Sequence, residues 1–126
     1  MPLVFMLLGM LLLASSVMLG AYGTHGLYEA GAMADEVRAW DWANQIHVAH
    51  SLGLLIVGML LRRKPEVFFY KLTGWLLIAG VVLFSFTIYV KTMGGPDLAA
   101  LTPYGGMTLA LAWLCAAIGA WRDFRS

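Results

Sequence analysis

Charged residues and cysteine are scarce in this chain. Only 12% of its 126 residues are charged and 61% are hydrophobic, whereas about 25% of the residues of a typical soluble domain are charged. The net charge of +1 provides no basic stripe of the kind that nucleic-acid-binding proteins need, so we expect no nucleic-acid partner. Cys115 is the only cysteine, which excludes a disulfide within the chain and a dithiol redox pair.

The familiar signatures of catalysis are also missing. Ser51 directly follows His50, but sequential neighbours on a helix point apart, so these two residues do not form a nucleophile and its base. The sequence contains no Gly-x-Ser-x-Gly elbow and no His-Glu pair of the metalloprotease type. We therefore expect that the protein is not an enzyme.

Four apolar stretches make up most of the chain. They cover residues 2–22, 42–61, 72–90 and 104–121, and each is about long enough to cross a bilayer. Backbone polar groups in lipid must be paired internally, which favours helices, and the short connections favour antiparallel neighbours. The sequence therefore predicts an all-α, integral membrane protein whose single domain, residues 1–126, is an antiparallel up-down four-helix bundle. The first stretch lacks a charged n-region and is too long for a signal peptide, so we expect it to be a retained span.

The charges between the stretches predict the topology. The segment from Tyr28 to Asp41 is acidic, and six of the eight basic residues lie at the other end of the predicted bundle: Arg62, Arg63, Lys64, Lys71, Arg122 and Arg125. The positive-inside rule makes that end cytoplasmic. We therefore predict a multi-pass protein of the bacterial inner (plasma) membrane, with both termini in the cytoplasm and the acidic segment outside.

All three histidines belong to the predicted outer end of the bundle. His25 follows the first apolar stretch, and His47 and His50 lie three residues apart near the start of the second, where that spacing places them on one helix face. Ionisable groups inside a membrane are costly and are candidates for function. We expect His50 to be the deepest of the three and to share this level with other polar side chains, namely Tyr22, Ser85, Tyr89 and Thr102.

Three interpretations of this polar cluster remain open. In the first, neutral imidazoles bond to Tyr, Ser or Thr across the bundle and no cofactor is present. In the second, the histidines bind a transition metal or a haem, because imidazole suits Zn, Cu and Fe and bundle cofactors sit between facing helices. In the third, the cluster serves a small channel or transporter, although the predicted spans contain no Asp or Glu for proton coupling.

Five glycines are predicted to pack helices closely together: Gly20, Gly23, Gly53, Gly105 and Gly106. Small residues let the backbones of membrane helices approach one another. These contacts lie either within the bundle or in a homo-oligomer or larger membrane complex. We also expect the glycine-rich segment from Gly20 to Gly26 to end the first helix.

Four short motifs carry a resemblance to a known family. They are Gly-Ala-Tyr-Gly-Thr-His-Gly-Leu over residues 20–27, His-Ser-Leu over 50–52, Phe-Ser-Phe-Thr-Ile-Tyr over 84–89 and Thr-Pro-Tyr-Gly-Gly over 102–106. In this order they resemble the YgdD-like family of small inner-membrane proteins, catalogued as domain of unknown function 423. The resemblance covers nearly the whole chain and implies the four-span fold and an inner-membrane location. It implies no activity, substrate or cofactor.

The chain departs from this family pattern at two positions. His47 stands where the family carries Gln, so we expect it to be the least functional of the histidines. Phe86 replaces a glycine of the family in the third predicted span, so a very close helix approach is not expected there. The preferred hypothesis is a non-enzymatic accessory or assembly subunit of a membrane complex. A metal- or haem-binding bundle and a small channel or transporter are the alternatives.

Overall fold

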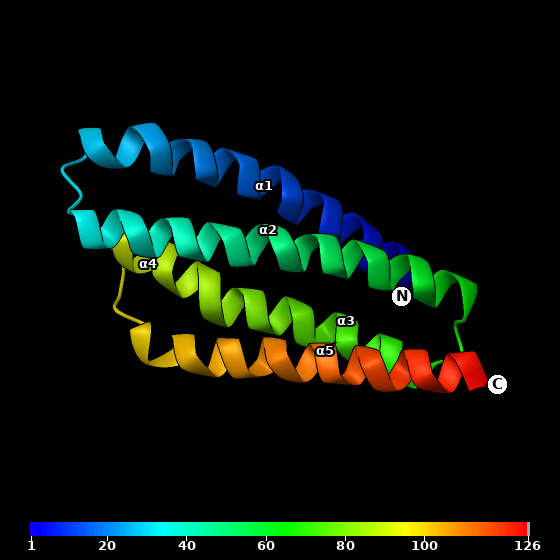
Figure 1. Ribbon diagram of the computed structural model, residues 1–126. Helices are drawn as coiled ribbons and strands as arrows, with labels where there is room; N and C mark the ends of the chain where they lie inside the picture. The colour runs from blue at the N-terminus through cyan, green and yellow to red at the C-terminus, as the bar shows by residue number, and fades with distance from the viewer. Residues whose placement is uncertain (126) are drawn as a thin grey trace.

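The computed structural model describes residues 1–125, and all of its regular elements are helical. These helices form long rods, and consecutive rods run antiparallel (Figure 1). The elements are, in order, α1 (Pro2–Glu29), α2 (Ala34–Arg63), α3 (Phe68–Val81), the π-helix η1 (Val82–Phe86), α4 (Thr87–Thr92), the 3₁₀-helix η2 (Ala99–Leu101) and α5 (Thr102–Arg125). Elements α3, η1 and α4 form one rod, and η2 leads into α5. Within residues 1–125, four helices are long and apolar enough to cross a membrane, which confirms the predicted all-α, four-span fold.

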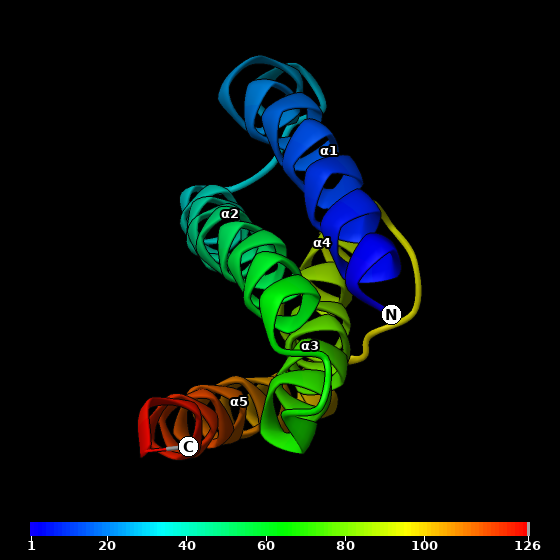
Figure 2. The ribbon, with the colours of Figure 1, turned by 90° about the vertical axis from the view of Figure 1, so that its right-hand side faces the viewer.

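The connections define two ends of the molecule. Both termini and the α2–α3 connection lie at one end, which we call the basic end (Figure 1). The α1–α2 and α4–η2 connections lie at the opposite, acidic end. Seen along the helices, α1 and α5 lie on opposite sides of the central pair formed by α2 and α3 (Figure 2). The bundle is therefore an open row of helices, with α1 packed mainly on α2 and α5 mainly on α3.

Helix α1 is longer than predicted. It continues past Tyr22 through Gly23 and Gly26 to Glu29, so the expectation that the glycine-rich segment ends this helix is wrong. These glycines accommodate aromatic rings: Trp40 lies against Gly23, and Tyr22 against Gly26. The turn instead uses Gly31, whose φ of +83° lies in the left-handed region that glycine tolerates best.

Helix α2 begins at Ala34, well before the apolar stretch that starts at Trp42. Its first turn is capped by Glu36, whose Oε1 accepts a hydrogen bond from the backbone N–H of Met33 at 3.0 Å. A carboxylate at this position satisfies an otherwise unpaired donor and favours the positive end of the helix dipole. The acidic segment therefore continues the second membrane helix beyond its apolar part.

Two apolar clusters form the core. The larger cluster lies toward the basic end and includes Phe5, Leu54, Val57, Leu61 and Leu77. The Phe5 ring occupies the space over Gly74 of α3 and so ties α1 to the third rod. The smaller cluster lies toward the acidic end and joins Leu27, Trp40, Ala43 and Tyr89 from three rods.

Close helix contacts occur at four of the five predicted glycines. A Cβ added at Gly105 would lie 2.5 Å from the backbone nitrogen of Phe84, and one at Gly53 would lie 2.7 Å from the Trp113 ring. Gly20 faces the Asn44 side chain at 3.0 Å and Gly23 faces Trp40 at 2.5 Å. Gly106 differs, because an added Cβ would be 3.8 Å from its nearest neighbour, an ordinary contact distance.

Gly9, which the motifs do not single out, lies directly against the backbone of α2. A Cβ at Gly9 would lie 2.9 Å from the Leu55 backbone nitrogen and 3.1 Å from the Ser51 carbonyl oxygen. Backbone cannot move aside as a flexible side chain can, so this contact requires glycine. Four further glycines, which the motifs did not single out, also lie against neighbouring helices: Gly58, Gly74, Gly80 and Gly119.

Candidate functional site

A buried histidine joins three of the four rods near the acidic end. His47 of α2 is 0% exposed. Its Nδ1 lies 3.0 Å from the Tyr89 hydroxyl of α4, and its Nε2 lies 3.3 Å from Ser15 Oγ of α1. Both ring nitrogens therefore have partners.

The neighbouring hydrogen bonds assign the proton on this ring. Ser15 Oγ donates to the Leu12 carbonyl oxygen at 2.8 Å, so Ser15 accepts the Nε2–H of His47. Asn44 Nδ2 donates to the Tyr89 hydroxyl at 3.3 Å, which leaves the Tyr89 proton free to be donated to Nδ1. A neutral imidazole has one donor nitrogen and one acceptor nitrogen. Here the donor Nε2–H bonds to Ser15, and the acceptor Nδ1 receives the Tyr89 proton.

The result is a chain of hydrogen bonds that all point the same way. It runs from Asn44 through Tyr89, His47 and Ser15 to the Leu12 carbonyl, and we call these four side chains the His47 network. Asn44 also donates to the Ser16 carbonyl oxygen at 2.9 Å. Neither ring nitrogen of His47 has a free lone pair, so binding a metal at this ring would require a hydrogen bond of the network to break.

Two further side chains near the network form hydrogen bonds from one helix to another. The indole N–H of Trp40 donates to the Leu19 carbonyl at 2.8 Å. The Ser85 hydroxyl, in η1, donates to the Ala43 carbonyl at 2.7 Å and is fully buried. The π-helix η1 interrupts the regular α-helical hydrogen-bond pattern, and such interruptions are often found at functional sites. In this protein η1 carries Ser85, which makes the contact with α2.

The predicted cluster is divided by the structure. Ser85, Tyr89 and His47 gather at the α2–η1–α4 contact, whereas Thr102 Oγ1 lies 2.9 Å from Thr87 Oγ1. The Tyr22 ring packs against Trp40 with their ring centroids 5.5 Å apart. His25 is exposed, and within residues 1–125 it makes no hydrogen bond to the network.

Of the two histidines of α2, His47 is fully buried and His50 is only half-buried. The reason is the rotation of α2, which points His47 toward α1 and α4 and points His50 toward α5. Asn44 and Ser15, the other members of the network, were not singled out from the sequence. The spacing of Asn44, His47 and Ser51 by three and four residues is the pattern that marks this helix face.

His50 has the opposite proton arrangement. Its Nδ1 lies 2.7 Å from the Ile46 carbonyl oxygen, and because a carbonyl only accepts, Nδ1 carries the proton. Nε2 then bears a lone pair, for which residues 1–125 supply no hydrogen-bond partner. The ring packs beside Trp113 of α5, with ring centroids 5.9 Å apart. No group of three or more His, Cys, Asp and Glu side chains able to hold a metal occurs in this same described part.

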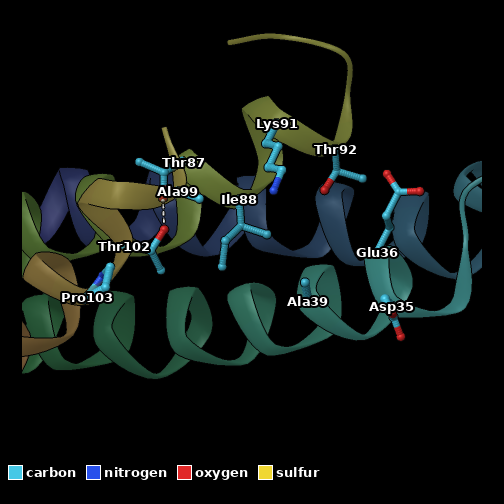
Figure 3. Close-up of a pocket in the computed structure, with 10 residues that line it drawn as sticks. All are labelled: Asp35, Glu36, Ala39, Thr87, Ile88, Lys91, Thr92, Ala99, Thr102 and Pro103. Atoms are coloured by element: carbon cyan, nitrogen blue, oxygen red, sulfur yellow. Dashed lines mark hydrogen bonds between the residues drawn. The ribbon is translucent and has the colours of Figure 1, made fainter. Parts of the chain in front are cut away.

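A cavity of about 450 Å³ lies at the acidic end between α2, α4 and the start of α5 (Figure 3). Its lining is mostly apolar, with Lys91, Thr92 and Glu36 pointing along one edge in Figure 3. The full lining is Asp35, Glu36, Ala39, Thr87, Ile88, Lys91, Thr92, Ala99, Thr102 and Pro103. The lining includes no member of the His47 network.

This arrangement defines a small polytopic membrane protein with polar contacts between its helices. Residues 19–106 match the family model described as "Protein of unknown function (DUF423)". The chain belongs to this family, which confirms the resemblance carried by the four motifs.

Named relatives from bacteria and yeast are similar over most of their length. The chain is 34% identical to the UPF0382 membrane protein YwdK of Bacillus subtilis over 119 residues, which covers 93% of this chain and 95% of YwdK. It is 36% identical to the UPF0382 membrane protein SH2409 of Staphylococcus haemolyticus, covering 87% and 88% of the two chains. The UPF0382 membrane protein C1782.12c of Schizosaccharomyces pombe is 34% identical, with 78% and 85% covered. No solved structure matches the chain.

Proposed function

We propose that the protein is a non-enzymatic accessory or assembly subunit of a membrane complex. It acts in the bacterial inner membrane, with the basic end and both termini in the cytoplasm. The partner is another membrane protein that packs against the outer helices α1 and α5.

The uneven burial of the four rods is the observation that carries this proposal. In the most apolar windows of α2 and of the third rod, 44% of residues are buried, compared with 17% in α1 and 22% in the rod that contains α5. The open row leaves α1 and α5 each packed along one side only (Figure 2). Long faces of this kind are available to helices of a partner, which associate in lipid through packing and polar contacts.

The use of the buried polar groups supports a non-catalytic role. The His47 network ends on the backbone carbonyl of Leu12, and Ser85 and Trp40 also donate to backbone carbonyls. Their hydrogen-bonding capacity is taken up by contacts between helices. The polar side chains of the His47 network, with Ser85 and Trp40, are therefore committed to contacts between helices.

Photo-crosslinking in native membranes tests this proposal. A photoreactive residue at exposed Leu7 of α1 or Leu114 of α5 should give one reproducible adduct with a second membrane protein. The same residue at Leu54, which is buried between helices, is the matched control and should give none. Adducts with lipid alone at both exposed positions would contradict an accessory role.

His50 supports a second candidate function, binding of a metal or a haem. Its Nε2 carries the lone pair that a metal ligand needs, and the proton on Nδ1 is held by the Ile46 carbonyl, which is the usual way in which a ligating histidine is oriented. The test is the metal content and absorption spectrum of protein purified from native membranes. Stoichiometric metal, or a haem band, that is lost in His50→Ala would establish this function instead.

A further inference from the structure

The cavity at the acidic end lies at the level of lipid headgroups. Its lining residue Ala39 is one helical turn before Trp42, and Pro103 directly precedes Tyr104. Trp42 and Tyr104 are both exposed, and exposed Trp and Tyr at the ends of membrane spans mark the boundary between headgroups and hydrocarbon. A ligand of this cavity is therefore a molecule of the bilayer surface.

The edge of the cavity offers one cationic and one anionic group. Lys91 Nζ lies 3.7 Å from Asp97 Oδ2, and both side chains are more than half exposed, so this ion pair is weak and the ammonium keeps donors for a ligand. Glu36 uses Oε1 for the helix cap, and its other oxygen can accept a further bond. Asp35 is bonded to Arg38, and its carboxylate points away from the cavity edge (Figure 3).

The rest of the cavity suits a hydrocarbon chain. Ala39 of α2, Ile88 of α4, Ala99 of η2 and Pro103 of α5 supply apolar surface from three sides. Burying apolar area of this kind favours binding in proportion to the area covered. An occupant with both charges at one end and an apolar body matches the lining.

We propose that this cavity binds a zwitterionic phospholipid with a primary ammonium group, of the phosphatidylethanolamine class. Lys91 and the Thr92 hydroxyl donate to the phosphate, the lipid ammonium donates to Glu36, and an acyl chain lies along Ile88 and Pro103. This site goes beyond the proposed accessory role and does not depend on it, since it would exist with or without a protein partner.

Native mass spectrometry of the purified full-length protein tests this site. The protein is exchanged into detergent with equal amounts of phosphatidylethanolamine, phosphatidylcholine and phosphatidylglycerol that have the same acyl chains. We expect phosphatidylethanolamine to be retained about fivefold more than either competitor, an effect typical of one or two exposed charged contacts. Equal retention of the three lipids would overturn the proposal, because it indicates non-specific lipid around the helices.

Two charge-removing variants and one control assign the contacts. Lys91→Gln should lower retention of phosphatidylethanolamine, and Glu36→Gln should abolish its preference over phosphatidylglycerol. Gln can still cap α2, so Glu36→Gln leaves the helix start intact, and an unchanged melting temperature checks this. Arg63→Gln removes an exposed cation at the basic end, far from the cavity lining, and should change nothing. Unchanged lipid selectivity in both lining variants would overturn the assignment.

A soluble headgroup separates the lipid from a free phosphate compound. Phosphoethanolamine without acyl chains should fail to displace the bound lipid at equal concentration, because it lacks the apolar contact. Displacement at equal concentration would overturn the lipid assignment and would instead identify a water-soluble zwitterion as the ligand.

Discussion

The Nδ1 atom of His47 lies 3.0 Å from the hydroxyl of Tyr89, and this bond connects α2 to α4 in the interior of the bundle. Tyr89 also accepts a bond from Asn44, so one hydroxyl serves two side chains of α2. Loss of that hydroxyl would leave Nδ1 of His47 and one of the two N–H groups of Asn44 Nδ2 without a partner. Such groups cost more than the lost bond itself.

Tyr89→Phe should therefore destabilise the protein by about 1–3 kcal/mol, although the ring and its packing against Trp40 are retained. The measurement is unfolding in detergent, by heat or denaturant. Tyr104→Phe is the matched control, because Tyr104 is exposed and its hydroxyl should not matter. Equal stability of the two variants would show that the network contributes nothing.

The two histidines of α2 should differ strongly in their effect on stability. His47→Ala removes partners of Tyr89 and Ser15 and opens a buried space, so we expect a loss of about 2 kcal/mol or more. His50→Ala removes one bond to the backbone of its own helix and should cost about 1 kcal/mol or less. A larger loss for His50→Ala would mean that the assignment of the buried face of α2 is wrong.

Adjacent glycines of α5 give a second paired comparison. Gly105→Ala would bring a Cβ against the backbone of η1 and should destabilise by about 1–3 kcal/mol through overpacking. A Cβ added at Gly106 would lie 3.8 Å from its nearest neighbour, an ordinary contact distance. Gly106→Ala should therefore be neutral, or stabilising by up to about 1 kcal/mol, because alanine favours helix. Melting temperatures of the two variants, measured side by side, check the predicted order.

The orientation in the membrane remains a prediction from the basic residues. A reporter that is active only in the periplasm should be inactive when fused to the C-terminus and active when inserted near Asp35. The physical reason is that the basic end is retained in the cytoplasm. The reverse pattern of reporter activity would contradict this topology.

The sequence predicts the spans well but not their rotation. Apolar runs identify four helices because lipid and core both require apolar side chains. For the same reason hydrophobicity does not distinguish the lipid-facing side from the core-facing side, so it does not predict that His47 rather than His50 is the fully buried histidine. The polar residues Asn44, His47 and Ser51 do mark the inner face, because unpaired polar groups are costly in lipid.

The π-turn and the extension of α1 lay beyond sequence reasoning for a different reason. Both depend on neighbours that are distant in sequence: Ser85 meets the Ala43 carbonyl, and Gly23 meets the Trp40 ring. Local propensity alone favours a break at the glycines of residues 20–26. Packing against α2 overrides that preference, since the aromatic rings fill the space that the glycines leave.

We propose that the buried polar groups serve the fold and that the protein acts through a membrane partner. The most direct measurement is gentle purification from native membranes, with the co-purifying proteins, the metal content and the absorption spectrum recorded on one sample. We expect a stoichiometric membrane-protein partner together with a spectrum free of haem bands and less than stoichiometric metal. A stoichiometric haem or metal that disappears in His50→Ala, with no protein partner present, would contradict this proposal.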